Sequence, residues 1–129
     1  MQHDPLNDAL VLIKNAASTG KLECTVRPSS QLIASVLRVM QDNHYISRFE
    51  FVEDGKAGLF KVALNGNINN CGVIKPRYAV KKVELEKWES RFLPAQDFGV
   101  LILTTTAGVV THAQAREKGV GGKLLAFVY

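Results

Sequence analysis

The stretch from Phe98 to Thr111 reads FGVLILTTTAGVVT, and it decides how the second half of the chain folds. Its first six residues, 98–103, contain no charged side chain and no hydroxyl group. A short, continuously apolar run of this kind is typical of a strand that is buried on both faces. Three threonines and a glycine follow in residues 104–108. The sequence therefore predicts a buried strand that ends in a hydroxyl-rich loop.

A short helix and a last strand are predicted after this loop. Thr111 and Gln114 fit a capping box, in which the hydroxyl caps the helix and the glutamine reaches back to the cap amide. Gly119 provides a left-handed stop, and Gly121-Gly122 turns the chain into a strand over 123–129. If the two strands pair, the small residues before the last strand lie near the threonines.

Residues 72–82, GVIKPRYAVKK, are predicted to form an amphipathic strand before the buried one. Alternation places Lys75, Arg77 and Lys81 on one face and apolar side chains on the other. Two interpretations of the basic face stay open, a surface for a polyanion and a charged edge that discourages aggregation. Pro76 cannot donate to a ladder, so it belongs at an edge or a bulge. A short helix over 84–92 follows, with Trp88 as its packing anchor.

The first half of the chain is predicted to run α-β-α-β-β. Asp4 is expected to cap the first helix, and Ser29 or Ser30 is expected to cap the second. The last two strands flank a turn that contains Asp54-Gly55. Residues 65–70, rich in Asn and Gly, mark the boundary between two lobes, 1–64 and 65–129. The predicted fold class is α+β: two small α/β lobes, of which the second is mainly an antiparallel sheet with short helices.

Charge is distributed unevenly between the lobes. The 129 residues carry 16 Lys and Arg against 12 Asp and Glu, a net charge of +4. Residues 1–64 hold seven of each sign, whereas residues 65–129 hold nine basic against five acidic side chains. A basic surplus permits an anionic partner but does not identify one. No apolar run is long enough to span a membrane, and the N-terminus lacks the pattern of a secretory signal, so we expect a soluble cytoplasmic protein.

Catalytic, metal and cofactor sites are not expected. Residues 119–123, GVGGK, precede a strand and lack the remaining positions of a phosphate-binding P-loop. His112 and Cys71 have no orienting acid near them in the sequence, and His112 is expected at the surface. Cys24 and Cys71 are expected to be buried, reduced thiols, because neither lies at a zinc-ligand spacing. The sequence therefore predicts a protein that is not an enzyme.

The chain resembles the eighth protein of the small ribosomal subunit, in the archaeal and eukaryotic branch of that family. The resemblance covers essentially the whole chain, and the helix around Trp88 favours that branch over the shorter bacterial form. It is carried by the opening DPLNDAL with Lys14-Asn15 and by five further segments: RPSSQLI at 27–33, HYISRFEF at 44–51, GVIKPRY at 72–78, LPAQDFGVLILTTTAG at 93–108 and GVGGKLLAFVY at 119–129.

The resemblance implies a fold of two small, tightly packed α/β lobes. It also implies a primary binder of the central domain of small-subunit ribosomal RNA that is needed for subunit assembly. The family's Ser-Thr-Ser motif matches Thr104, Thr105 and Thr106, which would contact bases and sugars together with Ala107 and Gly108. The family's Gly-Gly turn matches Gly121-Gly122. Three segments match parts that face the RNA backbone or an adjacent RNA helix: Lys14-Asn15, Pro28-Ser29-Ser30 and Lys75-Pro76-Arg77. Thr replaces Ser at two motif positions, and Ala107 stands where bacterial members often carry Lys.

These inferences combine into a division of labour. Cations supply phosphate attraction, whereas the loop 104–108 reads a distorted RNA minor groove. The expected cations are Lys75, Arg77, Lys81, Lys82 and Lys123. Expected partners are the ribosomal RNA and neighbouring small-subunit proteins, with a monomer outside the ribosome and a cytoplasmic location inside it. An alternative function is repression of a messenger RNA that mimics the ribosomal site.

Overall fold

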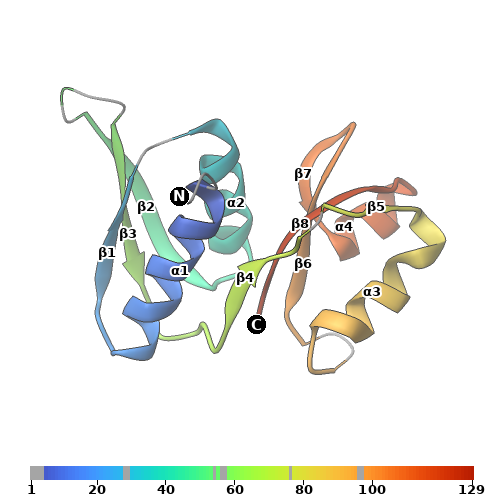
Figure 1. The fold of residues 1–129 in the computed structure, drawn as a ribbon, viewed down its shortest axis with the longest axis horizontal. Coiled ribbons are helices and arrows are strands. Elements are labelled where there is room, and N and C mark those ends of the chain that lie inside the picture. Colours follow the sequence, from blue (N-terminus) through green and yellow to red (C-terminus); the bar gives the residue numbers. More distant parts are fainter. Residues whose placement is uncertain (1–4, 28–29, 54, 56–57, 76, 96–97) are drawn as a thin grey trace. The chain divides into compact units, whose positions relative to one another are not determined.

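The computed structural model describes residues 5–27, 30–53, 55, 58–75, 77–95 and 98–129, and two compact units make up the chain. The first unit covers residues 1–72 and the second covers residues 73–129. The chain passes from one to the other within a short strand, β4 (Cys71–Val73), so the turn-rich residues 65–70 belong to the first unit. Figure 1 shows both units as helices packed on sheets, which confirms the predicted two-lobed α+β fold class.

The first unit has the predicted order α-β-α-β-β. Its three strands form an antiparallel sheet in the order β1-β3-β2. Each helix buries one apolar stripe, which in α1 runs from Leu6 to Ala16 and in α2 from Ile33 to Met40. The elements are α1 (Pro5–Ser18), β1 (Glu23–Val26), α2 (Gln31–Asp42), β2 (Ile46–Val52) and β3 (Leu59–Leu64).

Local capping explains where α2 begins. Ser30 is the N-cap, with an extended backbone, and its hydroxyl oxygen accepts a hydrogen bond of 3.1 Å from the Ile33 amide. This bond satisfies one of the amides that have no partner inside a helix. Of the two serines that the sequence offered as caps, Ser30 fills the role, whereas Ser29 and the cap proposed at Asp4 lie outside the described residues.

Two asparagine side chains stabilise the turn between α2 and β2. Asn65 and Asn67 donate side-chain hydrogen bonds of 3.0 and 2.7 Å to the carbonyl oxygen of His44. His44 has a φ of 65°, and among the described residues it is the non-glycine residue with a positive φ. The left-handed conformation crowds a Cβ atom, so the turn carries local strain that these hydrogen bonds offset.

Replacing His44 with glycine should therefore stabilise the protein by about 0.5–1 kcal/mol, because glycine adopts this backbone conformation without a steric penalty. Urea denaturation of His44→Gly and wild type would measure the difference. Gln41→Gly, at an exposed position of α2 with ordinary helical geometry, is the matched control and should lose about 1 kcal/mol. A His44→Gly variant that loses stability like the control would contradict the assigned strain.

The second unit is built on a sheet in the order β4-β8-β6-β7, with β5 paired to β8. The described pairings β5–β8, β6–β7 and β6–β8 are antiparallel, so the sheet is antiparallel as predicted, although no strand was predicted at the position of β7. The elements that follow β4 are β5 (Ala79–Val80), the 3-10 turn η1 (Lys82–Glu84), α3 (Leu85–Phe92), β6 (Val100–Thr105), β7 (Gly108–Thr111), α4 (His112–Lys118) and β8 (Gly122–Val128). None of the described helices is long and apolar enough to cross a membrane.

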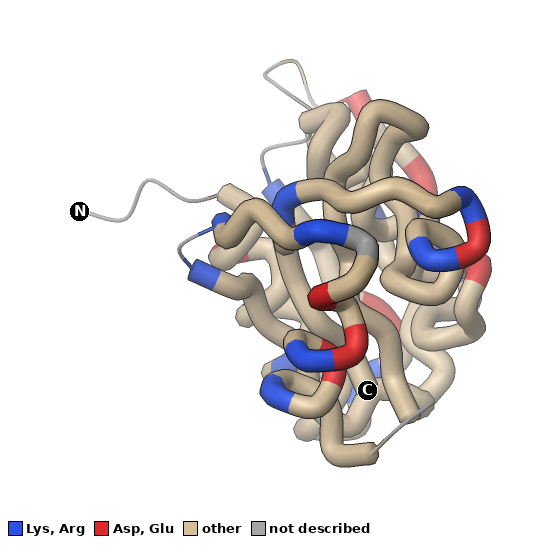
Figure 2. Tube along the Cα trace, turned by 90° about the vertical axis from the view of Figure 1, so that its right-hand side faces the viewer, with Lys and Arg blue, Asp and Glu red and all other residues tan. Residues whose placement is uncertain are grey.

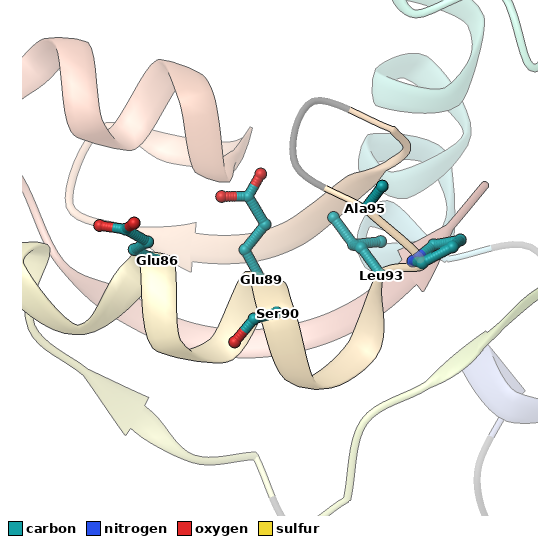
Figure 3. Close-up of a pocket in the computed structure, with 6 residues that line it drawn as sticks. Glu86, Glu89, Ser90, Leu93 and Ala95 are labelled. Carbon is teal, nitrogen blue, oxygen red and sulfur yellow. The ribbon is translucent and has the colours of Figure 1, made fainter.

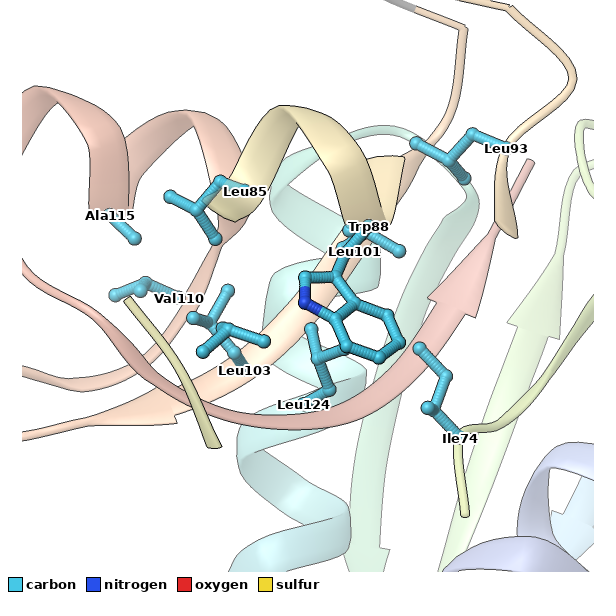
Figure 4. Close-up of a cluster of buried hydrophobic side chains, with 10 residues drawn as sticks. Ile74, Leu85, Trp88, Leu93, Leu101, Leu103, Val110, Ala115 and Leu124 are labelled. Atoms are coloured by element: carbon cyan, nitrogen blue, oxygen red, sulfur yellow. The ribbon is translucent and has the colours of Figure 1, made fainter. Parts of the chain in front are cut away.

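The core of the second unit lies between β6, β8 and the helix α3 (Figure 4). Leu101, Ile102 and Leu103 of β6 are fully buried, so the strand is covered on both faces as predicted. Trp88 is 7% exposed, and its ring stacks on that of Tyr78 with a centroid distance of 4.7 Å. The packing role predicted for Trp88 is thus confirmed.

Two predicted strands differ from the structure. The buried strand was expected to begin at Phe98, but β6 begins at Val100 and Phe98 is 48% exposed. Gly99 has a φ of 93°, which turns the chain before the sheet begins. Residues 72–82 were expected to form one strand, but in the described part of this segment only β4 and β5 are strands, and residues 74, 75, 77 and 78 lie outside them. The predicted alternation of buried and exposed side chains nevertheless holds at Ile74 and Val80.

Candidate functional site

The three threonines lie at a tight β-hairpin, not in an open loop. Thr104 and Thr105 end β6, and Gly108, with a φ of 105°, begins β7. Thr105 pairs with Gly108, so Thr106 and Ala107 alone form the turn between the strands. A loop was predicted here because the pattern of residues 108–111 had not indicated a strand. The hairpin presents both turn residues to solvent.

The three hydroxyl groups have different roles. Thr105 Oγ1 donates a hydrogen bond of 2.9 Å to the Gly108 carbonyl and accepts one of 3.0 Å from the Ala107 amide. This hydroxyl closes the turn. The hydroxyls of Thr104 and Thr106 make no hydrogen bond with any described residue. Thr104 is half-buried and Thr106 is exposed, so these two hydroxyls can donate to and accept from a ligand.

Strand pairing places a cation beside the hairpin. Thr104 pairs with Val109 of β7 on one side and with Lys123 of β8 on the other. Lys123 in turn pairs with Ala79 of β5. Paired residues of an antiparallel sheet point to the same face, so Lys123 and Thr104 are neighbours on one face. The structure thus brings together two residues that the sequence proposed as one site.

Gly122 sits against the end of β6. A Cβ atom at this position would collide with the carbonyl oxygen of Thr104 and would lie 2.8 Å from Cγ2 of Thr105. Only glycine therefore permits this close approach of β8 to β6. The prediction that the small residues before the last strand lie near the threonines is confirmed at this position. Gly121, which precedes it, is half-buried.

The other predicted cations of the second unit follow the opposite edge of β8. Ile74 donates a backbone hydrogen bond of 2.9 Å to Leu125, and Leu124 donates one of 2.9 Å to Tyr78. Lys75 and Arg77, which lie between β4 and β5, and Lys81, which follows β5, are exposed. Pro76 and the side chain of Lys82 lie outside the described residues. Figure 2 shows acidic positions directly beside several basic ones along the trace, so the positive surplus is modest.

The predicted residues of the first unit are positioned by its helices. Lys14 and Asn15 are exposed on α1, on the side away from the buried stripe. The Asn15 carbonyl accepts hydrogen bonds of 3.0 Å from the hydroxyls of Ser18 and Thr19, so the last turn of α1 is closed by side chains. Ser30 accepts from Ile33, but its hydroxyl hydrogen can still be donated outward.

A buried polar pair was missed by the sequence reasoning. His112, expected at the surface, is 4% exposed, and Glu89 of α3 is 3% exposed. His112 Nε2 lies 3.2 Å from Glu89 Oε2, and its Nδ1 accepts a hydrogen bond of 3.1 Å from the Leu101 amide. Glu89 Oε1 also lies 3.4 Å from Nη2 of Arg116. The available signal was the position of Glu89, which lies four residues after Leu85 and therefore within the apolar stripe of α3.

A small cavity opens beside α3 near this pair (Figure 3). Its volume is about 170 Å³. The residues that line it are Glu86, Glu89, Ser90, Leu93, Pro94 and Ala95. None of them belongs to the hairpin or to β8, so the hydroxyls of Thr104 and Thr106 belong to an exposed surface and not to this pocket.

The two cysteines are protonated thiols at neutral pH. Burial raises the pKa of Cys71 to about 12, although Lys14 acts in the opposite direction, and Cys71 Sγ lies 3.5 Å from the Leu10 carbonyl that accepts its hydrogen. Burial also raises the pKa of Cys24, with a further contribution from Glu23. Cys24 is only half-buried, in contrast to the expectation. Among the described residues, no group of three or more His, Cys, Asp and Glu side chains could hold a metal ion.

Comparison with known proteins gives consistent matches over the full length. The family model described as "Ribosomal protein S8" matches residues 4–129. The small ribosomal subunit protein uS8 of Methanococcoides burtonii is 62% identical over 126 residues, which cover 98% of this chain and 97% of that protein. The proteins of the same name from Picrophilus torridus and Thermoplasma volcanium are each 56% identical over 129 residues, with complete coverage of both chains.

Proposed function

The chain belongs to the ribosomal protein S8 family, and from this premise we propose that it is a structural constituent of the small ribosomal subunit that binds its RNA. The family consists of structural proteins, so the chain is not an enzyme. We further propose that its RNA target is the central domain of small-subunit ribosomal RNA and that binding contributes to subunit assembly. The resemblance of the residue 93–108 and 119–129 segments to the family supports this target.

The observation that carries the proposal is the hairpin with two unengaged hydroxyls. Thr106 lies at the turn and Thr104 lies at the end of β6, next to Lys123. RNA presents 2′-hydroxyls and base edges in a shallow minor groove, and small hydroxyl side chains can donate to and accept from both. The tight turn, with no long side chain at Ala107 or Gly108, allows the backbone to approach closely. These features favour contact with a shaped RNA site.

Cations and hydroxyls would divide the work of binding. Lys123, Lys75, Arg77 and Lys81 would attract phosphates without regard to sequence, whereas Thr104 and Thr106 would contact bases and sugars. Lys14-Asn15 and Ser30 of the first unit are proposed as additional contacts with the RNA backbone. A net charge of only +4 suits a protein that recognises a shaped site more than it attracts any polyanion.

The first test of the readout role is Thr106→Val, which keeps the side-chain shape but removes the hydroxyl. Loss of one hydrogen bond should weaken binding of a central-domain RNA fragment by about 1 kcal/mol, or roughly fivefold, with the salt dependence unchanged. Filter binding or fluorescence anisotropy would measure both quantities. Thr25→Val, at an exposed position of β1, is the matched control. Equal losses for the central-domain fragment and for a generic duplex would contradict the readout role.

The proposed contact of Lys123 with an RNA phosphate predicts a different result when Lys123 is replaced by glutamine. Removing one phosphate contact should lower the slope of log K against log salt by about one unit and should weaken all RNAs alike. Affinities measured across a salt series would give the slope. Lys87→Gln provides the control, because Lys87 lies over the Trp88 ring on α3, at 6.0 Å from its centroid. A slope that stays unchanged in Lys123→Gln would remove Lys123 from the proposed interface.

The same surface would bind a messenger RNA that folds like the ribosomal site, so repression of such a messenger is the alternative function. RNA recovered with the protein from growing cells would distinguish the two, since only the repressor role predicts a specific messenger beside ribosomal RNA. The ribosomal role also predicts neighbouring proteins and a cytoplasmic location within the small subunit, with a monomer outside it. Sedimentation of cell extracts tests this, because a protein found mainly away from small subunits would contradict it.

A further inference from the structure

The side chain of His112 provides one further hydrogen-bond acceptor at the end of the ladder between β6 and β7. The last pair of this ladder joins Ile102 with Thr111, after which the chain turns into α4. The preceding residue of β6, Leu101, lies beyond the end of β7. Its amide donates to His112 Nδ1 at 3.1 Å. The imidazole therefore takes the place of a strand carbonyl at the base of the hairpin.

This contact requires one particular tautomer of His112. An imidazole nitrogen accepts a hydrogen bond only when it carries no hydrogen, so the ring hydrogen must be on Nε2. Nε2 faces the Glu89 carboxylate at 3.2 Å, which accepts that hydrogen. The Leu101 amide and the Glu89 carboxylate thus favour the same tautomer from the two sides of the ring. The side chains of His112 and Glu89 are almost completely buried, so water does not compete for these hydrogen bonds.

We propose that Glu89 is a positioning residue for the hairpin: acting through His112, it closes the base of the β6–β7 ladder and so sets the direction of the hairpin tip, which carries Thr106. The proposal rests on the RNA-binding role proposed above. Pairing of β6 with β8 ends at Thr104 and Lys123, whereas the hairpin continues to the Thr105–Gly108 pair. The tip therefore depends on the β6–β7 ladder for its orientation, and the α3 helix braces that ladder.

Substitutions at Glu89 test whether the brace affects RNA binding. Glu89→Leu fills the site without an acceptor, and we expect about tenfold weaker binding of a central-domain RNA fragment with an unchanged salt slope, since no phosphate contact is lost. Glu89→Gln offers an amide oxygen to Nε2 and should stay within about threefold of wild type. Glu86→Leu, on the exposed side of the same helix, is the control and should bind like wild type.

Variants at His112 give a second, independent measurement. Asparagine places a carbonyl oxygen where histidine carries Nδ1, so His112→Asn should still accept from Leu101 and should retain RNA binding. His112→Leu provides no acceptor and should behave like Glu89→Leu. Nitrogen-15 spectra of wild type should show His112 with its hydrogen on Nε2, and amide exchange at Leu101 should be slow in His112→Asn but fast in His112→Leu.

The outcomes separate this proposal from the proposed function. If Thr106→Val weakens RNA binding but a folded Glu89→Leu binds within twofold of wild type, the positioning role is wrong and the hairpin still reads RNA. If neither variant changes binding, the hairpin is not the RNA site. Should Glu89→Leu fail to fold, the His112 pair decides, because equal RNA affinity in the Asn and Leu variants would overturn the proposal. A wild-type spectrum with the hydrogen on Nδ1 would also overturn it.

Discussion

Replacing Trp88 with alanine should remove about 3–5 kcal/mol from the free energy of unfolding, the cost of deleting a large buried aromatic side chain. Trp88 is 7% exposed, and its ring stacks with those of Tyr78 and Phe92, at centroid distances of 4.7 Å and 6.1 Å. Arg91 covers the ring at 5.2 Å from the centroid. The substitution would leave a cavity under α3, in the middle of the cluster drawn in Figure 4. Urea denaturation followed by circular dichroism measures the loss.

Trp88→Phe is the informative companion, because the indole N–H is buried without a hydrogen-bond partner among the described residues. Leaving a buried donor unpaired costs about 1–3 kcal/mol, and phenylalanine removes that cost together with part of the ring. We therefore expect Trp88→Phe to remain within about 1 kcal/mol of wild type. A loss as large as that of Trp88→Ala would show that the indole nitrogen is hydrogen bonded in solution.

The second large effect is expected for Gly122→Ala. Its Cβ atom would collide with the Thr104 carbonyl oxygen and crowd the methyl group of Thr105, so β8 must move away from β6. Overpacking of this kind costs about 1–3 kcal/mol, and a backbone atom can yield less than a flexible side chain. We expect a loss near the upper limit, together with weaker binding of a central-domain RNA fragment, because the displaced strand carries Lys123 beside Thr104.

Gly66→Ala is the control that distinguishes a steric collision of the new Cβ atom from the energetic cost of a left-handed backbone. Gly66 has a φ of 79°, but a Cβ atom there would meet nothing within 4 Å. Its replacement should therefore cost only about 1 kcal/mol, the penalty of a left-handed backbone, and should leave RNA affinity unchanged. Denaturation and RNA titration of both variants give the comparison. If Gly122→Ala keeps the stability and RNA affinity of wild type, β8 and β6 lie further apart than the structure indicates.

Helices and strands were predictable where apolar residues recur with the period of a helix or a strand, or where a capping residue marks a helix end. The capping box at Thr111 forms in full, with Gln114 Oε1 accepting from the Thr111 amide and Thr111 Oγ1 accepting from the Gln114 amide. Gly119 ends α4 in the left-handed conformation, as predicted. These signals are local, since the interacting atoms belong to residues three or four positions apart. For the same reason they could not predict that residues 74, 75, 77 and 78 lie outside the strands.

The candidate site was predicted as a set of residues but not as an arrangement. The sequence could not assign different roles to Thr104, Thr105 and Thr106, because the bond from Thr105 to Gly108 exists only once β7 pairs with β6. The burial of His112 depends on Glu89, which is 23 residues earlier in the chain. The position of Glu89 in the apolar stripe of α3 indicates that Glu89 is buried, but it does not identify His112 as its partner. The contacts of these residues with RNA stay a prediction.

The strand order of the second unit has a consequence for synthesis. β8 follows every other strand of its sheet in the sequence, yet it lies between β4 and β6. While the chain is being translated, β4, β5 and β6 therefore have no partner strand on the side that β8 will occupy. Pairing between strands far apart in sequence forms slowly, and unpaired edges are prone to association. We expect a nascent chain that lacks β8 to fold its first unit but to gain RNA affinity only after β8 has emerged.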